Sequence, residues 1–222
     1  DAFFLSHTSE PVEVPEQELV DRYLPPYRPE YKLDVDDPRA FSGITMPSEY
    51  MELRYKMERA MEEALEVARA ADLEFQRMFG RSYGLVEPYM LDGAEIALVT
   101  SGTVTSTARL VIKELQQRGV PVGLLKIRLF RPFPIAEVRK HLAGLEKIAV
   151  IDRNISFGYG GIFAQEIKSA LYNLDKGPRP PLFGFVAGLG GRDITPEVIK
   201  EIIEYTRAHD RPEDIIWIGV KR

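Results

Sequence analysis

The sequence predicts an α/β fold: a three-layer, doubly wound domain around a mainly parallel sheet of about five strands. Two observations support this prediction. From residue 94 onward, short apolar runs rich in branched residues alternate with helical patterns, and glycine-rich turns stand where two of those runs give way to a helix. Such alternation implies crossover connections, which cover both faces of a parallel sheet with helices. An irregular proline-rich arm and a long helix are expected to precede this domain.

The elements of the domain are expected in a regular order. The strands are residues 96–100, 122–127, 148–152, 182–186 and 215–218. The helices between them are residues 104–118, 135–142, 162–174 and 196–209. Thr195 and Pro196 form a typical helix start, since threonine caps the first turn and proline is favoured at the first helical position.

Residues 48–79 carry the clearest helical pattern ahead of the sheet. Ser48 is expected to cap this helix and Gly80 to end it. A stripe of apolar residues recurs at alternating spacings of four and three: Met57, Met61, Ala64, Ala68, Ala71, Phe75 and Met78. The small residues in its middle suit close approach to another helix or to the body of the protein. We interpret the stripe as a packing surface, because methionines in such a pattern usually fill a core.

The segment before the long helix is a connector. Residues 10–41 contain six prolines, which exclude a long helix or a central strand. Only residues 16–24 have room for a short helix. Tyr23, Tyr27 and Tyr31 are expected to anchor this arm on a neighbouring surface, and a solvated linker with incidental tyrosines is the alternative. The chain begins at Asp1 without an initiator methionine, so we expect it to be part of something longer.

Composition excludes several classes of function. The net charge is −5 and no basic cluster stands out, so a nucleic-acid partner is not expected. Cysteine is absent, which excludes disulfides and thiolate ligands for an iron–sulfur cluster in this chain. The three histidines lie far apart, so no metal site is expected. No apolar run approaches the ~20 residues that cross a bilayer, and we expect no membrane partner.

Candidate site residues come from loops that follow strands, where parallel sheets form their sites. The loops are residues 101–106, 130–134, 153–161 and 188–193, and none matches a dinucleotide or phosphate-loop fingerprint. An arginine beside an amide or carboxylate either pairs structurally or offers its guanidinium to an anion, and both interpretations stay open. A histidine near the start could act as an acid or base only beside a reacting group. The cofactor-binding candidates are Arg153, Asn154, Arg192, Asp193 and His7, and we expect no catalytic residue.

Several of these stretches together resemble a known family. Residues 1–8, residues 99–103, the motif Phe130-Arg131-Pro132-Phe133-Pro134, and the glycine-rich residues 151–161 and 187–195 occur in the order found in the alpha subunit of pyruvate (2-oxoacid):ferredoxin oxidoreductase. Ala2 stands where that family's Asp-Gly-Phe-x-x-Ser-His pattern has glycine. The resemblance spans nearly the whole chain.

The resemblance implies a division of the chain. Residues 1–9 would be a remnant of an upstream thiamine-pyrophosphate domain of the pyrimidine type, and residues 10–93 a proline-rich connector with the long helix. Residues 94–222 would be the transketolase C-terminal-like domain II. Partners implied are the upstream pyrimidine-type domain, a thiamine-binding beta subunit and gamma and delta subunits or domains, with ferredoxin and coenzyme A engaged by the whole enzyme.

The resemblance also implies an activity. Members convert a 2-oxoacid, coenzyme A and oxidised ferredoxin into acyl-coenzyme A, carbon dioxide and reduced ferredoxin. Thiamine pyrophosphate with Mg and iron–sulfur clusters serve the complete enzyme, and none is expected to be held by this chain, which would be architectural, inert alone and cytoplasmic in an anaerobe. Two alternatives remain: the same domain in another thiamine-dependent enzyme, and a stand-alone anion-binding module.

Overall fold

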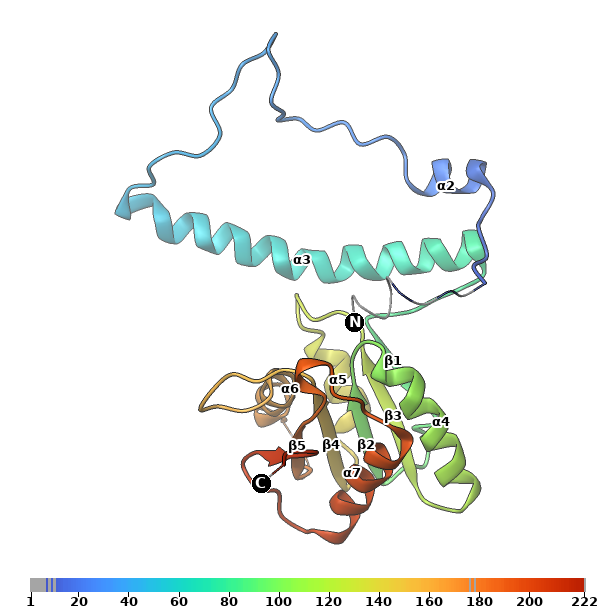
Figure 1. Ribbon diagram of the computed structural model, residues 1–222. Helices are drawn as coiled ribbons and strands as arrows, with labels where there is room; N and C mark the ends of the chain where they lie inside the picture. Colours follow the sequence, from blue (N-terminus) through green and yellow to red (C-terminus); the bar gives the residue numbers. More distant parts are fainter. Residues whose placement is uncertain (1–6, 8, 10, 176, 178, 222) are drawn as a thin grey trace. The chain divides into compact units, whose positions relative to one another are not determined.

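The computed structural model describes residues 7, 9, 11–175, 177 and 179–221. The chain divides into two compact units, which are described separately below (Figure 1). The first, here called the arm unit, comprises residues 7–82. The second, the sheet unit, contains residues 83–222 and every strand found among the described residues.

The sheet unit is built on six strands in the order β1-β3-β2-β4-β5-β6. Neighbouring strands from β3 to β6 are parallel, and β1 is antiparallel to β3, with Val86 opposite Ile127. The strands are β1 (Val86–Tyr89), β2 (Ile96–Thr100), β3 (Val122–Ile127), β4 (Lys147–Asp152), β5 (Leu182–Val186) and β6 (Ile216–Trp217). The central strands β2, β4 and β5 are almost wholly buried. Helices cover both faces of a parallel sheet, and for this reason the sequences of its central strands are nearly continuous apolar runs.

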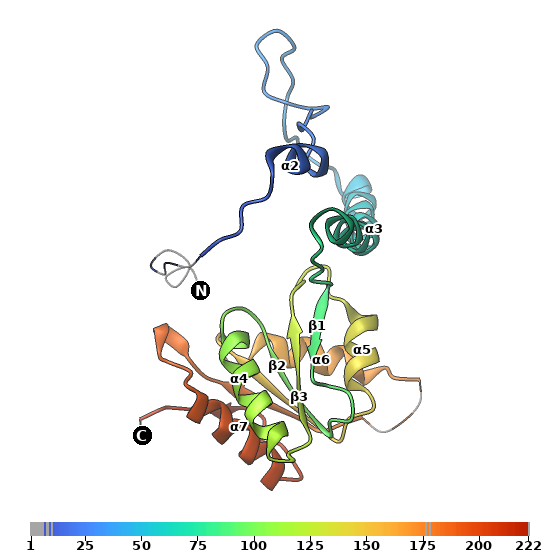
Figure 2. The same ribbon diagram turned by 90° about the vertical axis from the view of Figure 1, so that its right-hand side faces the viewer.

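Helices cover both faces of this sheet. The helices are α4 (Val104–Gln117), α5 (Ile135–Leu142), α6 (Ile162–Tyr172), the short η1 (Leu189–Gly191) and α7 (Pro196–Ala208). Figure 2 shows α4 and α7 together on one side and α5 on the other, where α5 contacts α6. Alternate strand residues serve the two faces: Leu98 packs in the α4–α7 core, whereas Ala97 and Val99 pack in the α5–α6 core. The doubly wound, mainly parallel fold is therefore confirmed.

The expected strands differ from the observed ones at both edges of the sheet. β1 was not predicted, and β6 covers two residues instead of four. The sequence of β1 has a glutamate and a proline in its middle, which is compatible only with an edge strand. Glu87 forms ion pairs with Arg109 of α4 and Lys126 of β3, which add a small contribution to the backbone ladder that joins β1 to β3.

The arm unit includes the helices α2 (Gln17–Tyr23) and α3 (Pro47–Phe79). Gly80 ends α3 as predicted, in a left-handed conformation with φ of 70°. The expected cap at Ser48 was wrong: Met46 is the N-cap residue, because Pro47 occupies the favoured first helical position.

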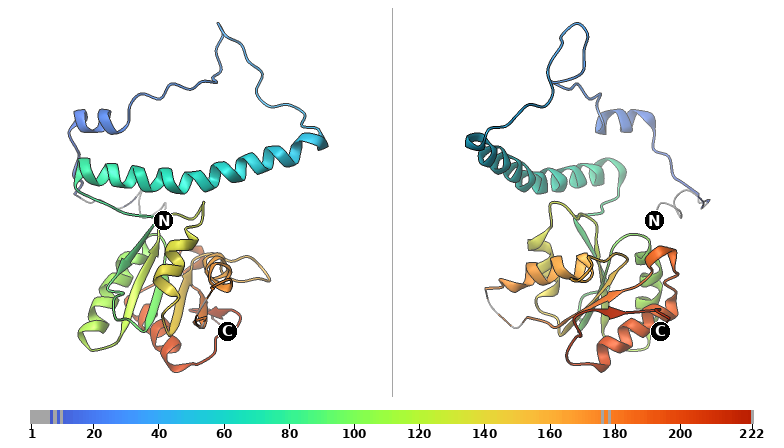
Figure 3. Two further views of the ribbon diagram at one scale, coloured as in Figure 1. Left: turned by 180° about the vertical axis from the view of Figure 1, so that it is seen from behind. Right: turned by 60° about the vertical axis from the view of Figure 1, so that its left-hand side comes forward.

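The short helix α2 lies beside the C-terminal end of α3 (Figure 3). Tyr23 makes edge-on contacts with Phe75 and Phe79, with ring centroids 5.4 and 5.6 Å apart, and its hydroxyl donates to the Ala71 carbonyl at 3.1 Å. This is the anchoring expected of the arm's tyrosines. Tyr27 and Tyr31 are instead exposed, as the linker alternative would have them. Among the described residues no helix is both long and apolar enough to span a bilayer.

Candidate functional site

The carboxyl ends of the parallel strands form a crevice where the chain changes direction across the sheet. After β2 the chain continues through α4 to β3 on one side, whereas β4 lies on the other side of β2. The helices that follow β2 and β4 cover opposite faces, because α4 belongs to one core and α6 to the other. Their loops therefore diverge, and open α/β sheets bind ligands at such a point.

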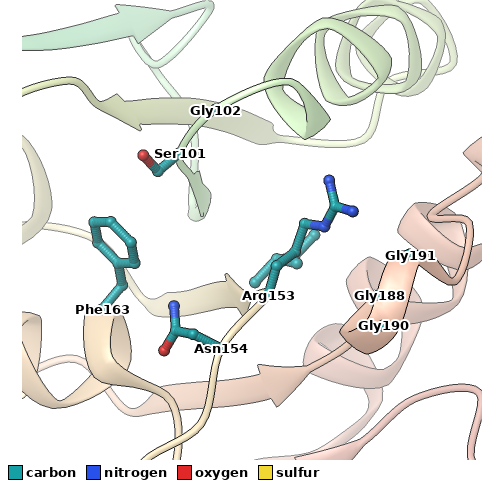
Figure 4. A pocket seen from close by; sticks show the side chains of 9 residues that line it. Ser101, Gly102, Arg153, Asn154, Phe163, Gly188, Gly190 and Gly191 are labelled. Atoms are coloured by element: carbon teal, nitrogen blue, oxygen red, sulfur yellow. The ribbon is translucent and has the colours of Figure 1, made fainter. Parts of the chain in front are cut away.

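A pocket of about 390 Å³ lies at this crevice, formed by loops that follow β2, β4 and β5 (Figure 4). Three of the four predicted loops contribute to its lining. The lining residues are Ser101, Gly102, Ile151, Arg153, Asn154, Phe163, Gly188, Gly190 and Gly191. The fourth loop, residues 130–134, lies behind the lining, where Phe130 packs on Phe163 with ring centroids 5.1 Å apart.

Two polar side chains build the loop after β4. Asn154 accepts a hydrogen bond through Oδ1 from the Ile162 amide at 2.9 Å. The carboxylate of Asp152 accepts from the amides of Phe163 at 2.9 Å and Ala164 at 3.0 Å. The first three amides of α6 are thus satisfied from within the loop, so this helix start is not available to bind an anion.

Asp152 is fully buried, and sequence reasoning did not single it out. Burial raises the pKa of its carboxyl, although the amides of Ala164 and Phe163 and the Asn154 side chain, which donates to Oδ1 at 3.1 Å, favour the charged form. Only glycine fits at position 161, because an added Cβ would lie 2.1 Å from Asp152 Oδ2. The sequence does contain a signal for this role: Asp152 stands at the end of a strand, nine residues before Gly161, and a helix begins directly after that glycine.

Arg153 is the charged side chain that lines the pocket. It is half-buried, and its Nη1 lies 3.5 Å from the Thr103 hydroxyl, at the start of α4. Gly188 permits this position: its φ is 71°, and an added Cβ would lie 3.1 Å from Arg153 Nε. Figure 4 shows Arg153 between the turn at Gly102 and the turn at Gly188–Gly191.

The structure places the other candidate residues outside the pocket that Arg153 and Asn154 line. Arg192 does not line the pocket; its Nη1 donates to the Gly219 carbonyl, which ties the loop after β5 to the segment after β6. Asp193 is exposed and does not line the pocket either. His7 is exposed and belongs to the arm unit.

The polar side chains that line the pocket are those of Ser101, Arg153 and Asn154. Ser101 donates its hydroxyl to the Ile127 carbonyl at 3.0 Å, so it is engaged with backbone instead of with a general base. The lining carries one guanidinium, one amide and a hydroxyl, and it includes no histidine or carboxylate. Within the described part of the chain, no three histidine, cysteine or acidic side chains come together as a metal site.

Comparison with known proteins places the chain in a family. Residues 94–199 match the family described as pyruvate:ferredoxin oxidoreductase core domain II. Residues 1–72 match the family described as pyruvate flavodoxin/ferredoxin oxidoreductase, thiamine diP-bdg. The two matches together cover most of the chain.

Curated relatives agree with these matches along the full length of the chain. Pyruvate synthase subunit PorA of Methanothermobacter thermautotrophicus is 46% identical over 221 residues, which are 100% of this chain and 56% of the relative. Ketoisovalerate oxidoreductase subunit VorA of Pyrococcus abyssi is 42% identical over 227 residues, covering 100% of this chain and 57% of the relative. The chain thus spans little more than half the length of these relatives. It belongs to the family of pyruvate/2-oxoacid:ferredoxin oxidoreductase alpha subunits.

Proposed function

We propose that this chain serves as part of the alpha subunit of a 2-oxoacid:ferredoxin oxidoreductase, with pyruvate as its 2-oxoacid. The complete enzyme would convert the 2-oxoacid and coenzyme A into acyl-coenzyme A and carbon dioxide, and pass the two electrons released to oxidised ferredoxin. The observation that carries the proposal is the 46% identity to a pyruvate synthase subunit over the whole chain. A ketoisovalerate oxidoreductase subunit at 42% identity makes a branched 2-oxoacid the alternative substrate.

The cofactors of the reaction, thiamine pyrophosphate and iron–sulfur clusters, would be held by other domains or subunits of the complete enzyme. Thiamine pyrophosphate stabilises a carbanion and iron–sulfur clusters carry single electrons, when bound in the complete enzyme. The sequence has no cysteine that could bind a cluster, and the described residues include no group of three acids or histidines that could hold Mg²⁺. No step through these groups is therefore derived for this chain.

The role proposed for the chain is architectural. Its pocket lining shows no nucleophile paired with a base, and two of its glycines are explained by close packing, Gly161 against Asp152 and Gly188 against Ile194 and Arg153. Residues 94–222 would form the second domain, residues 10–93 the connector and residues 1–9 the end of the upstream thiamine domain. The thiamine-domain match runs on to residue 72, so that domain's sequence region would include most of the connector. We place the assembled enzyme in the cytoplasm.

The proposal is tested by 2-oxoacid-dependent reduction of ferredoxin or a viologen dye in the presence of thiamine pyrophosphate and coenzyme A. The chain is assayed alone and after co-expression with the rest of the PorA subunit and the other pyruvate synthase subunits of the Methanothermobacter relative. Activity only in the assembled mixture is expected. Pyruvate and 2-ketoisovalerate are compared to identify the substrate. Lack of both activity and association in every mixture would refute the proposal.

The pocket supports a second candidate, binding of a small anion. Arg153 brings positive charge to it, and the Gly188–Gly191 turn can present backbone amides, since three of its glycines have positive φ. Isothermal titration of the chain with inorganic phosphate would detect such binding. Arg153→Gln should abolish the heat of binding, whereas Arg192→Gln should not, because Arg192 does not line the pocket. Equal effects of the two changes would rule this candidate out.

A further inference from the structure

Along the N-terminal half of α3, no other described segment of the arm unit covers the helix. Every residue from 47 to 63 is exposed. One side of this stretch carries four large apolar side chains, here called the α3 face: Tyr50, Leu53, Met57 and Met61, whose exposed fractions are 49%, 44%, 50% and 39%. Large apolar side chains gathered on one side of a helix indicate an interaction surface.

The spacing of these residues places them on one stripe. Steps of three and four residues return to the same side of a helix with 3.6 residues per turn. The stripe continues through Ala64, Ala68, Ala71 and Phe75, which are half-buried, and at Ala71 and Phe75 it contacts Tyr23 of α2. One part of the stripe therefore already packs against a helix of the same unit, and the α3 face is its uncovered continuation.

The opposite side of α3 carries charged residues together with the exposed side chains of Tyr55 and Leu73. Arg59 pairs with Glu62 and Arg69 with Glu66, at spacings of three residues. Exposed pairs of this kind add only about 0.3–0.5 kcal/mol each. Helices in proteins owe most of their stability to packing of an apolar side, and a stretch of about this length is marginal alone in water. The α3 face continues the stripe that packs against Tyr23 further along the helix, as in a helix with one missing neighbour.

The family matches indicate which neighbour is missing. The match to the thiamine-diphosphate-binding family ends at residue 72 and includes the whole α3 face, whereas the match to domain II starts at residue 94. The α3 face thus belongs by sequence to the thiamine-binding region of the family. The relatives are nearly twice as long as their match to this chain, so they contain further protein that could cover it.

We propose that the α3 face docks onto the thiamine-diphosphate-binding domain of the alpha subunit, within the part of the relatives' length that this chain does not span. Tyr50, Leu53, Met57 and Met61 would enter an apolar groove of that domain. Through α3 the arm unit would then join that domain to domain II. This inference rests on the proposed function and assigns the surface through which the segments assemble.

The test uses the full 222-residue chain, co-expressed with the part of the Methanothermobacter PorA subunit to which it does not align. The two are expected to co-elute, and amides of residues 47–63 should exchange at least tenfold more slowly in the complex than in the chain alone. The variant Leu53→Glu/Met57→Glu should weaken the complex at least tenfold, because burying a single large apolar side chain already contributes about 1.5–3 kcal/mol and 1.4 kcal/mol is a factor of ten.

Met51→Glu is the matched control. Met51 is 78% exposed on the same helix but lies roughly 120° around the helix axis from Met57. Glutamate is a good helix former, so circular dichroism of all variants should match that of the parent chain. The control is expected to retain the affinity of the parent.

Four outcomes would overturn the inference. The first two are that the two proteins do not co-elute, and that Met51→Glu weakens the complex as much as the double variant does. The third is that the amides of residues 47–63 already exchange slowly in the chain alone. The fourth is that the chain associates with itself and the double variant abolishes this association, which would make a second copy the occupant. Failure of the proposed function can be distinguished from failure of the docking inference. In that case no assembled mixture would reduce ferredoxin, including the mixture that contains the Met51→Glu control. If only the docking inference fails, the assembled double variant keeps full activity.

Discussion

Removing the Asp152 carboxylate should destabilise the sheet unit through the start of α6. In Asp152→Ala the amides of Phe163 and Ala164 lose the acceptors they now reach at 2.9 and 3.0 Å, and Asn154 loses the oxygen it contacts at 3.1 Å. An orphaned amide at a helix start costs about 1–2 kcal/mol. Two such amides give an expected loss of roughly 2–4 kcal/mol in the free energy of unfolding.

Urea unfolding followed by tryptophan fluorescence measures this loss. The chain has one tryptophan, Trp217, which lies in β6, so the signal reports on the sheet unit. Asp193→Asn is the control, because Asp193 is exposed in the neighbouring loop and should change stability by less than about 0.5 kcal/mol. An Asp152→Ala variant as stable as the parent, or a control as damaging as Asp152→Ala, would refute the assigned role of the carboxylate.

Three further predictions test other parts of the structure. Gly123→Ala should destabilise the sheet unit by about 1–3 kcal/mol, since its Cβ would lie 2.6 Å from Leu91 Cα; unchanged urea unfolding would contradict the packing of that loop on β3. Burial lowers the pKa of His141 below its ordinary 6.5, so the folded state binds fewer protons at this residue than the unfolded state. The free energy of unfolding should therefore fall as pH drops below about 6.5. The variant His141→Asn should make the urea midpoint less sensitive to pH in that range, and identical pH profiles of variant and parent would disprove this. Tyr23→Ala should release α2 from Phe75 and speed amide exchange in α2 at least tenfold, because a seven-residue helix is not stable alone, while β-sheet amides serve as the internal control.

The alternation of strands and helices could be predicted because the pattern of each element lies within its own short stretch of sequence. β2, β4 and β5 are buried on both faces, so their sequences are continuous apolar runs that need no knowledge of the rest of the fold. Parallel strands also end at the same edge, and for this reason three of the four predicted loops meet in one pocket. The family resemblance followed from motifs in these same loops.

The roles of single side chains were decided by tertiary contacts. Arg153 and Arg192 look equivalent in the sequence, each after a strand and beside a polar residue. Arg153 reaches Thr103, fifty residues earlier, and lines the pocket, whereas Arg192 reaches Gly219 and stays outside it. Neither partner is local, so no pattern around either arginine could distinguish them.

The sequence alone determined the fold class, the family and the edge of the sheet at which the loops meet, because burial and strand direction repeat along the chain. The tertiary structure decided where β1 pairs, since Glu87 and Pro88 interrupt any apolar run in this edge strand and its place is set by the antiparallel ladder with β3, from Val86 opposite Ile127 to Tyr89 opposite Leu124. It also assigned Asp152 to the start of α6: a buried carboxylate is tolerated there because amides ten or more residues further along the chain fold back to donate to it.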